Sequence, residues 1–416
     1  MSNLAILPKY EAYKESGSEW LGDIPETWNL LSNKYIFKLK KNLVGKRSDE
    51  YELLSLTLRG IIKRDMENPE GKFPAEFNTY QEVASGDFVF CLFDVEETPR
   101  TVGLSSFNGM ITGAYTVFEA ISDFNKVFLY YFYLNLDSTK RLKPLYRGLR
   151  NTIPKDSFMG FKTFVPNFEQ QTLIASFLDK KTAQIDDAIA IKELQISLLK
   201  ERKQIIIQQA VTQGLDPNVP MKDSGVDWIG EIPEHWEVKA LKFIAYMKSG
   251  ETLSPDQFTE TGFPAYGGNG LRGYTSTFTN DGDHILIGRQ GALCGNVNYA
   301  SGKFYASEHA IVVYPLNNED TRWLGEAIRV ADFNRLSQSA AQPGIAVNVI
   351  KNVLFPHPPL LEQAGISKHI VEAERNIHKS IEIFNLQIEK LKEYKTSLIN
   401  SAVTGKIKIT PEMVEQ

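Results

Sequence analysis

The chain has 416 residues, of which 42% are hydrophobic and 23% are charged, and its formal net charge is −5. This length exceeds one ordinary core, so we expect two to three domains, and the negative charge excludes a general attraction to polyanions. Two cysteines, Cys91 and Cys294, provide neither a disulfide framework nor a zinc site. Without a signal-peptide pattern or a membrane-length apolar run, we expect a cytoplasmic protein that does not enter a membrane.

A motif near the N-terminus occurs twice. Residues 16–28 and 224–236 both read S-G-x-x-W-[LI]-G-[DE]-I-P-E-x-W, at a constant shift of 208. The shared positions include Trp20, Pro25 and Trp28 in the first copy. We interpret the chain as an internal duplication, with a function that requires two similar parts.

The first variable stretch, residues 31–164, is expected to mix short strands with amphipathic helices, as is its counterpart at 239–355. Its main charge feature is a basic run without acids between residues 140 and 155. Phosphate contact is one interpretation, and a solvated helix end is the other. The candidate DNA-binding residues in this run are Arg141, Lys143, Arg147 and Arg150.

Two long helices are predicted by further repeats. Residues 198–214 resemble 390–406 at a shift of 192, and Glu169 and Gln170 match Glu362 and Gln363 at a shift of 193. Apolar residues recur every seven positions on both segments, which is typical of a coiled-coil seam, with Lys192 as the exception. We expect the helices to pair antiparallel as a spacer, although each could instead pack on its own globular domain. The predicted pairing residues are Leu178, Ile185, Leu199, Ile206, Ile370, Ile377, Phe384, Leu391 and Leu398.

The second variable stretch contains two glycine-rich segments. In residues 263–278, Gly268, Gly270 and Gly273 satisfy G-x-G-x-x-G, but a turn follows where a dinucleotide site requires a helix. This segment is therefore a flexible loop or a loop that presents side chains to a ligand. In residues 287–299, Arg289 and Gln290 lie between glycines at an expected strand end, which is either a turn or a rigid support for two polar side chains. The candidate DNA-binding residues of this half are Tyr266, Asn269, Arg272, Arg289 and Gln290, because Asn and Arg side chains can read base edges.

No catalytic or metal-binding pattern is found. The sequence has no P-loop and no [NDS]-P-P-[YFW], and its six histidines lack ligand spacing. Ser307-Glu308-His309 has no nucleophile elbow around it. We therefore expect a chain that is not an enzyme and carries no catalytic residue, metal or cofactor.

The sequence resembles the specificity (S) subunits of type I DNA restriction–modification systems. The resemblance is carried by W-L-G-D-I-P-E-T-W and W-I-G-E-I-P-E-H-W, Y-G-G-N-G-L-R-G-Y, I-G-R-Q-G-A-L-C-G-N-V-N-Y, P-P-L-L-E-Q, and the paired L-L-K-E-R-K and K-L-K-E-Y-K helices. The first half departs from the pattern because it lacks the Tyr-Gly-Gly-Asn-Gly loop.

The resemblance implies an α+β fold with two target recognition domains, separated by two long antiparallel helices that form a coiled coil with a pseudo-twofold duplication. The expected ranges are 1–168 and 215–361 for the recognition domains, and 169–214 and 362–416 for the helices and C-terminal tail. Double-stranded DNA with a bipartite site, two modification (methyltransferase) subunits and restriction subunits are the implied partners. S-adenosylmethionine, ATP and Mg are expected only in those partners. The alternative is a coiled-coil scaffold with two protein- or sugar-binding modules.

Overall fold

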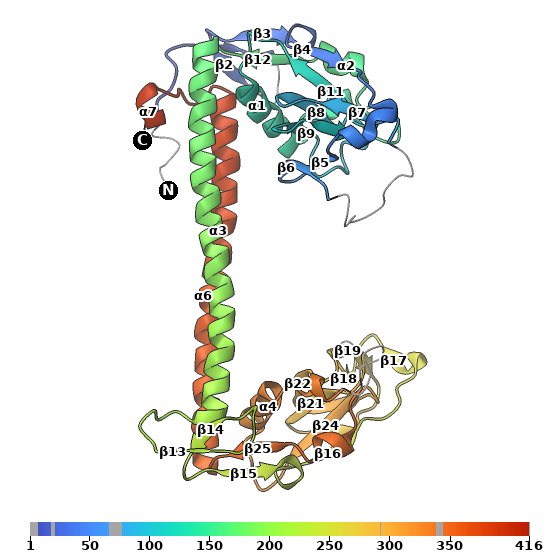
Figure 1. The fold of residues 1–416 in the computed structure, drawn as a ribbon, viewed down its shortest axis with the longest axis vertical. Helices are drawn as coiled ribbons and strands as arrows, with labels where there is room; N and C mark the ends of the chain where they lie inside the picture. Colours follow the sequence, from blue (N-terminus) through green and yellow to red (C-terminus); the bar gives the residue numbers. More distant parts are fainter. Residues whose placement is uncertain (1–6, 18–20, 66–76, 292, 338–343, 416) are drawn as a thin grey trace. The chain divides into compact units, whose positions relative to one another are not determined.

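The computed structural model describes residues 7–17, 21–65, 77–291, 293–337 and 344–415, so Trp20 of the repeated motif lies outside the described residues. The chain packs as two units (Figure 1). Unit 1 contains residues 1–192 and 386–416, and unit 2 contains residues 193–385. The two long helices, α3 (Phe168–Gln213) and α6 (Leu360–Val403), each contribute residues to both units.

Unit 1 is built around a four-stranded antiparallel sheet with the order β4-β11-β8-β9. Helix α1 covers this sheet and buries Phe128, Leu129 and Phe132. The elements are β4 (Phe37–Lys40), β8 (Asp87–Phe90), β9 (Val102–Leu104), β11 (Thr116–Ala120) and α1 (Lys126–Ser138). Unit 1 also contains four two-stranded sheets. They pair β1 (Tyr13–Glu15) with β2 (Asp23–Pro25), β3 (Asn29–Ser32) with β12 (Lys162–Val165), β5 (Leu54–Thr57) with β6 (Gly60–Lys63), and β7 (Gln81–Val83) with β10 (Gly109–Ile111). Short helices are α2 (Lys155–Gly160) and α7 (Pro411–Glu415).

Unit 2 repeats this plan. Its antiparallel sheet has the order β16-β24-β21-β22 and is covered by α4. The elements are β16 (Ala245–Ser249), β21 (His284–Gly288), β22 (Val297–Ala300), β24 (Ala310–Pro315) and α4 (Thr321–Val330). The pairs β13 (Met221–Asp223) with β14 (Glu231–Pro233), and β15 (Glu237–Ala240) with β25 (Leu354–His357), match pairs of unit 1. A five-stranded sheet is added, formed by β17 (Phe258–Thr259), β19 (Gly270–Thr275), β18 (Phe263–Gly267), β23 (Lys303–Ala306) and β20 (Asn280–Asp281), and α5 spans Val347–Ile350.

The duplication therefore extends into the variable stretches, whose sequences hardly match. In both units the four core strands pair in the order first, fourth, second, third along the chain. Gln171 accepts a bond from the Asn125 N–H and donates to the Pro166 carbonyl, and Gln363 bonds Asp320 and Pro358 in the same way. Gln363 is thus equivalent to Gln171 and not to Gln170. The shift of 193 was wrong at this junction because two adjacent glutamines offered two alignments.

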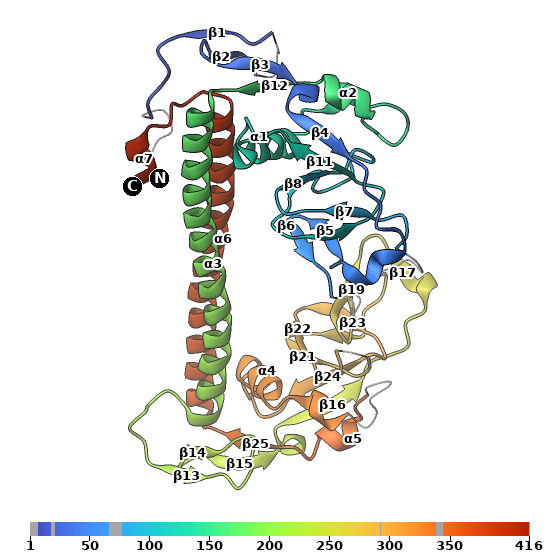
Figure 2. The same cartoon turned by 45° about the horizontal axis from the view of Figure 1, so that its top comes forward.

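The long helices lie side by side and run in opposite directions within each unit (Figure 2). In unit 1, Lys395 of α6 bonds both carboxylate oxygens of Asp186 of α3 at 2.7 Å. In unit 2, Lys203 of α3 lies 3.3 Å from Glu374 of α6. All nine residues predicted for the pairing seam are buried or half-buried. The predicted fold class, a mixed fold with two globular parts and a long antiparallel helix pair, is confirmed.

The repeated tryptophan motif packs against the C-terminal ends of the two long helices. Trp28 and Trp236 are fully buried, and each packs against the glycine that follows a long helix, Gly405 in unit 1 and Gly214 in unit 2. Gly405 has φ +72°, and a Cβ there would lie 2.4 Å from Cδ of Pro25. Side chains at this position would therefore be excluded both by backbone conformation and by space. The motif joins each globular part to its helix pair.

Candidate nucleic-acid interface

Unit 2 carries a hollow of about 380 Å³ that gathers the polar residues predicted from its two glycine-rich segments. Asn269 and Arg272 come from the β18–β19 hairpin, Gln290 follows β21, and His309 precedes β24. Asn269, Arg272 and Gln290 are exposed. The remaining lining residues are Gly268, Gly270, Leu271 and Leu293.

The backbone of the hollow explains its glycines. Gly268 and Asn269 form the two-residue turn between β18 and β19, so a strand follows the G-x-G-x-x-G segment and the segment is not a dinucleotide cradle. Gly288, the last residue of β21, passes so close to this turn that a Cβ would lie 2.5 Å from the Gly268 carbonyl oxygen. The two segments thus lie against each other, and the polar side chains are carried by paired strands or by residues next to them.

The hydrogen bonds of the hollow leave donors and acceptors available to a ligand. His309 Nδ1 and Gln290 Oε1 lie 3.2 Å apart, so an Nδ1–H tautomer donates to the amide oxygen, and this bond does not use the Gln290 NH₂ group. The Arg272 guanidinium lies 5.6 Å from the centre of the Phe258 ring. A carboxamide and a guanidinium on one edge are the groups that read adenine and guanine in the major groove.

Two predicted residues of this half lie outside the hollow. Tyr266 packs against the apolar cluster of the sheet, with its ring 5.8 Å from that of Phe304. Arg289 is half-buried and lines an adjacent hollow of about 200 Å³ with Gln290 and Gly344. Its carbonyl accepts a hydrogen bond from Ile345.

His309 lines the hollow, although the sequence does not predict it as a binding residue. In the sequence it stands out only in Ser307-Glu308-His309, which has no nucleophile elbow around it. No spacing pattern marks it, because its partner Gln290 is 19 residues away and is brought near by the pairing of β21 with β24.

In unit 1 the basic run forms a turn beside the end of β8. Lys143 pairs with Glu96 at 2.7 Å, and Arg147 donates to the Tyr146 carbonyl at 2.8 Å. Arg150 is exposed, and its carbonyl accepts from the Asp94 N–H at 2.9 Å. The Arg141 N–H donates to the Leu136 carbonyl, which continues the end of α1. The predicted arginines thus lie on a structured turn whose tip, Leu149, is fully exposed.

The end of the second core strand is contacted in the same way in both units. Ile153 donates its N–H to the Leu92 carbonyl after β8, and Ile345 donates to the Arg289 carbonyl after β21. In each unit, therefore, the segment before the last strand of the globular part (β12 in unit 1, β25 in unit 2) bonds to the end of the second core strand (β8 in unit 1, β21 in unit 2). The side chains at this edge differ, because Leu92 stands where unit 2 has Arg289.

Two thiols and one phenol near these surfaces have raised pKa values. Burial raises the pKa of the Cys91 and Cys294 thiols, so both stay protonated at neutral pH. Burial, together with Glu96 and Asp137, raises the pKa of Tyr146 to about 12. Among the residues that the structure describes, no group of three or more His, Cys, Asp or Glu side chains could hold a metal ion, and no helix is long and apolar enough to span a membrane.

Comparisons with known proteins agree on one family. Residues 233–395 match the family model described as "Type I restriction modification DNA specificity domain". The specificity subunit of the type I restriction enzyme EcoprrI of Escherichia coli is 37% identical over 134 residues, which are 31% of this chain and 33% of that protein. The MjaVIII specificity subunit of Methanocaldococcus jannaschii is 26% identical over 286 residues, or 62% of this chain and 64% of the relative. The matched segments thus span between a third and two thirds of these relatives.

Solved structures share the fold. A chain from a study of complex assembly and conformational transition of the type I R-M system superposes with a TM-score of 0.69 at 13% identity, covering 91% of this chain and 98% of that one. The HsdS subunit of Thermoanaerobacter tengcongensis gives a TM-score of 0.56 at 13% identity, with coverage of 94% and 100%. The predicted family resemblance is confirmed.

Proposed function

We propose, from the premise that this chain belongs to the type I restriction–modification specificity subunits, that the globular part of each unit reads one half of a bipartite DNA site. The observation that carries this proposal is the repetition of one sheet topology with different side chains at the end of the second core strand, where unit 1 has the buried Leu92 and unit 2 has the half-buried Arg289. Two domains with the same fold but different surface side chains suit a DNA site whose two halves differ in sequence. Contacts to base edges determine which sequence is bound, whereas the shared fold only positions the protein on the DNA.

The long helices serve as the spacer and the docking surface in this proposal. Their seam residues are covered, yet other apolar side chains of the pair remain exposed. In unit 2 these include Leu194, Leu198, Ile205, Val371 and Ile383. Exposed apolar residues along a helix pair suit a protein partner. We assign this surface to two modification subunits, and the length of the pair to the number of unread base pairs.

Chemistry lies in the partners under this proposal. Methyl transfer to adenine from S-adenosylmethionine would occur in the modification subunits, and ATP- and Mg-dependent cleavage in restriction subunits, all in the cytoplasm. This division suits the protonated cysteines and the absence of a metal-binding cluster among the described residues.

The decisive experiment replaces residues 239–355 with the corresponding stretch of another specificity subunit. The exchanged chain is expressed with its modification subunits, and methylated adenines are mapped genome-wide. We expect one half-site to change while the other half-site and the spacing stay. A matched exchange of residues 31–164 should change the opposite half. If the chain is instead a scaffold with protein- or sugar-binding modules, neither exchange alters a methylation pattern.

A further inference from the structure

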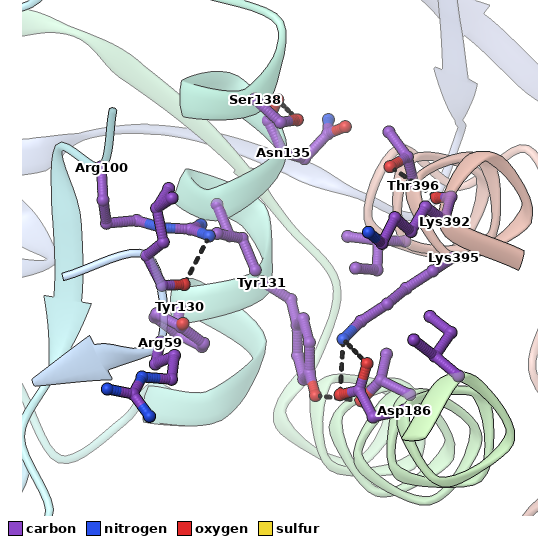
Figure 3. A pocket seen from close by; sticks show the side chains of 15 residues that line it. Arg59, Arg100, Tyr130, Tyr131, Asn135, Ser138, Asp186, Lys392, Lys395 and Thr396 are labelled. Carbon is purple, nitrogen blue, oxygen red and sulfur yellow. Dashed lines mark hydrogen bonds and ion pairs between the residues drawn. The ribbon is translucent and has the colours of Figure 1, made fainter. Parts of the chain in front are cut away.

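Unit 1 contains a cavity of about 660 Å³ between its globular part and its helix pair (Figure 3). The β5–β6 turn supplies Leu58 and Arg59, α1 supplies Tyr130 and Asn135, and both long helices complete the wall. None of the predicted DNA-binding residues lines it. Its volume falls within the range of about 300–1,000 Å³ typical of small-molecule sites.

The lining is positively charged. It holds four cations, Arg59, Arg100, Lys392 and Lys395, and one carboxylate, that of Asp186. Lys395 is bound to Asp186, and Arg100 donates to the Leu58 carbonyl at 3.1 Å. Arg59 and Lys392 are exposed and have no ion-pair partner within the described part of the chain. The cavity therefore favours an anion.

A buried amide faces the cavity without a partner. Asn135 is 2% exposed, and neither its Oδ1 nor its Nδ2 atom has a hydrogen-bond partner among the described residues. Its main-chain carbonyl accepts hydrogen bonds from the hydroxyls of Ser138 and Thr139. Figure 3 shows the side chain directed from α1 toward α6. Because an unpaired buried amide destabilises a folded chain, a ligand that bonds it would remove this cost.

The Asn135 amide donates through Nδ2 and accepts through Oδ1, so a matching ligand carries a hydrogen-bond acceptor next to a donor. The edges of nucleobases have this arrangement. The half-buried Tyr130 ring adds a flat face on the same wall, and Leu134, Ile189 and Ile399 add apolar surface. An aromatic ring, an unpaired amide and cations without ion-pair partners together match a base attached to a phosphate.

We propose that this cavity binds a mononucleotide, with its base edge bonded to Asn135 and its phosphate held by Lys392. The site is separate from the surfaces assigned to DNA reading, and the proposal holds whether or not the chain reads a bipartite site.

The test measures binding to the full chain by calorimetry and thermal unfolding, with AMP, GMP, CMP, UMP and inorganic phosphate as probes. We expect at least one mononucleotide to bind saturably and to raise Tm, because a ligand of the folded state stabilises it by mass action. Asn135→Leu should weaken that binding about tenfold or more, and should itself raise Tm by removing the unpaired amide. Lys392→Ala should weaken the mononucleotide but not the matching nucleoside. Lys379→Ala, at an exposed lysine of α6 outside the cavity, should leave binding unchanged.

Three results would overturn the proposal. One is the absence of heat and of a Tm shift with all four mononucleotides at millimolar concentration. Another is binding that neither Asn135→Leu nor Lys392→Ala weakens. The third is binding of a single-stranded oligonucleotide without binding of any mononucleotide, which would place the anion in a nucleic-acid strand.

Discussion

At the scale of single residues, Arg272 is an exposed cation of the hollow in unit 2. Because a guanidinium bonded to a base edge contributes about 1–3 kcal/mol of discrimination, Arg272→Ala should weaken site-specific binding of the assembled complex by that amount and relax one half-site only. Binding to a panel of sites with single base changes measures this. Lys242→Ala, at an exposed lysine bonded to Asn352, is the control and should leave the pattern intact. An equal loss across all sequences would identify Arg272 as a phosphate contact instead.

Gly288 determines whether the two segments of that hollow can meet. Gly288→Ala places a methyl group 2.5 Å from the Gly268 carbonyl and 2.6 Å from that of Leu293, so backbone must move. We expect a loss of about 1–3 kcal/mol in the free energy of unfolding, together with loss of recognition at the same half-site. Gly344→Ala is matched to it, because there the nearest atom is 3.7 Å away, and it should be nearly neutral. Equal denaturant midpoints for both variants would contradict this packing.

At the scale of elements, heptad spacing was sufficient to predict the long helices, because each turn repeats a local pattern. The shared core sheet was not predicted, since its strands are short and their pairing joins residues far apart, such as Phe37 with Ala120. The polar residues of the hollow were partly predictable. Neighbouring glycines in the sequence make Asn269, Arg272 and Gln290 recognisable as candidates. His309 has no such signal and lies near them only because β21 pairs with β24.

In the helix pair, substitutions of buried seam residues should lower the free energy of unfolding more than substitutions of exposed residues. Leu398 of α6 is fully buried in unit 1, whereas Leu386 on the same helix is 55% exposed. Leu398→Ala should lower the free energy of unfolding by about 2–4 kcal/mol through lost burial and a cavity, and Leu386→Ala by less than about 0.5 kcal/mol. Chemical denaturation of the two variants measures the difference. Similar midpoints would mean that the seam does not stabilise the fold.

The exposed apolar residues of α3 should instead affect assembly. Leu194 and Leu198 are 59% and 53% exposed, so Leu194→Ser with Leu198→Ser should leave Tm nearly unchanged. If this surface binds a modification subunit, the double variant weakens that complex, and co-purification with analytical ultracentrifugation detects the loss. Ser197→Ala, an exposed neighbour, is the control. Full assembly of the double variant would assign partner docking to another surface.

At the scale of the whole molecule, charge limits what the chain can do alone. Its net charge of −5 comes from 46 basic and 51 acidic residues, so few phosphates can be neutralised without repulsion elsewhere. We expect the isolated chain to bind duplex DNA only weakly, with a dissociation constant of roughly 10⁻⁴–10⁻⁶ M near physiological salt and little preference for its own site. Tight, specific binding should appear only when modification subunits close around the duplex. Fluorescence anisotropy of cognate and scrambled duplexes, across a salt series and with and without those subunits, separates the two states. A nanomolar, salt-resistant complex of the isolated chain would show that its two readers supply the affinity themselves, because no partner would then be needed to offset the net negative charge.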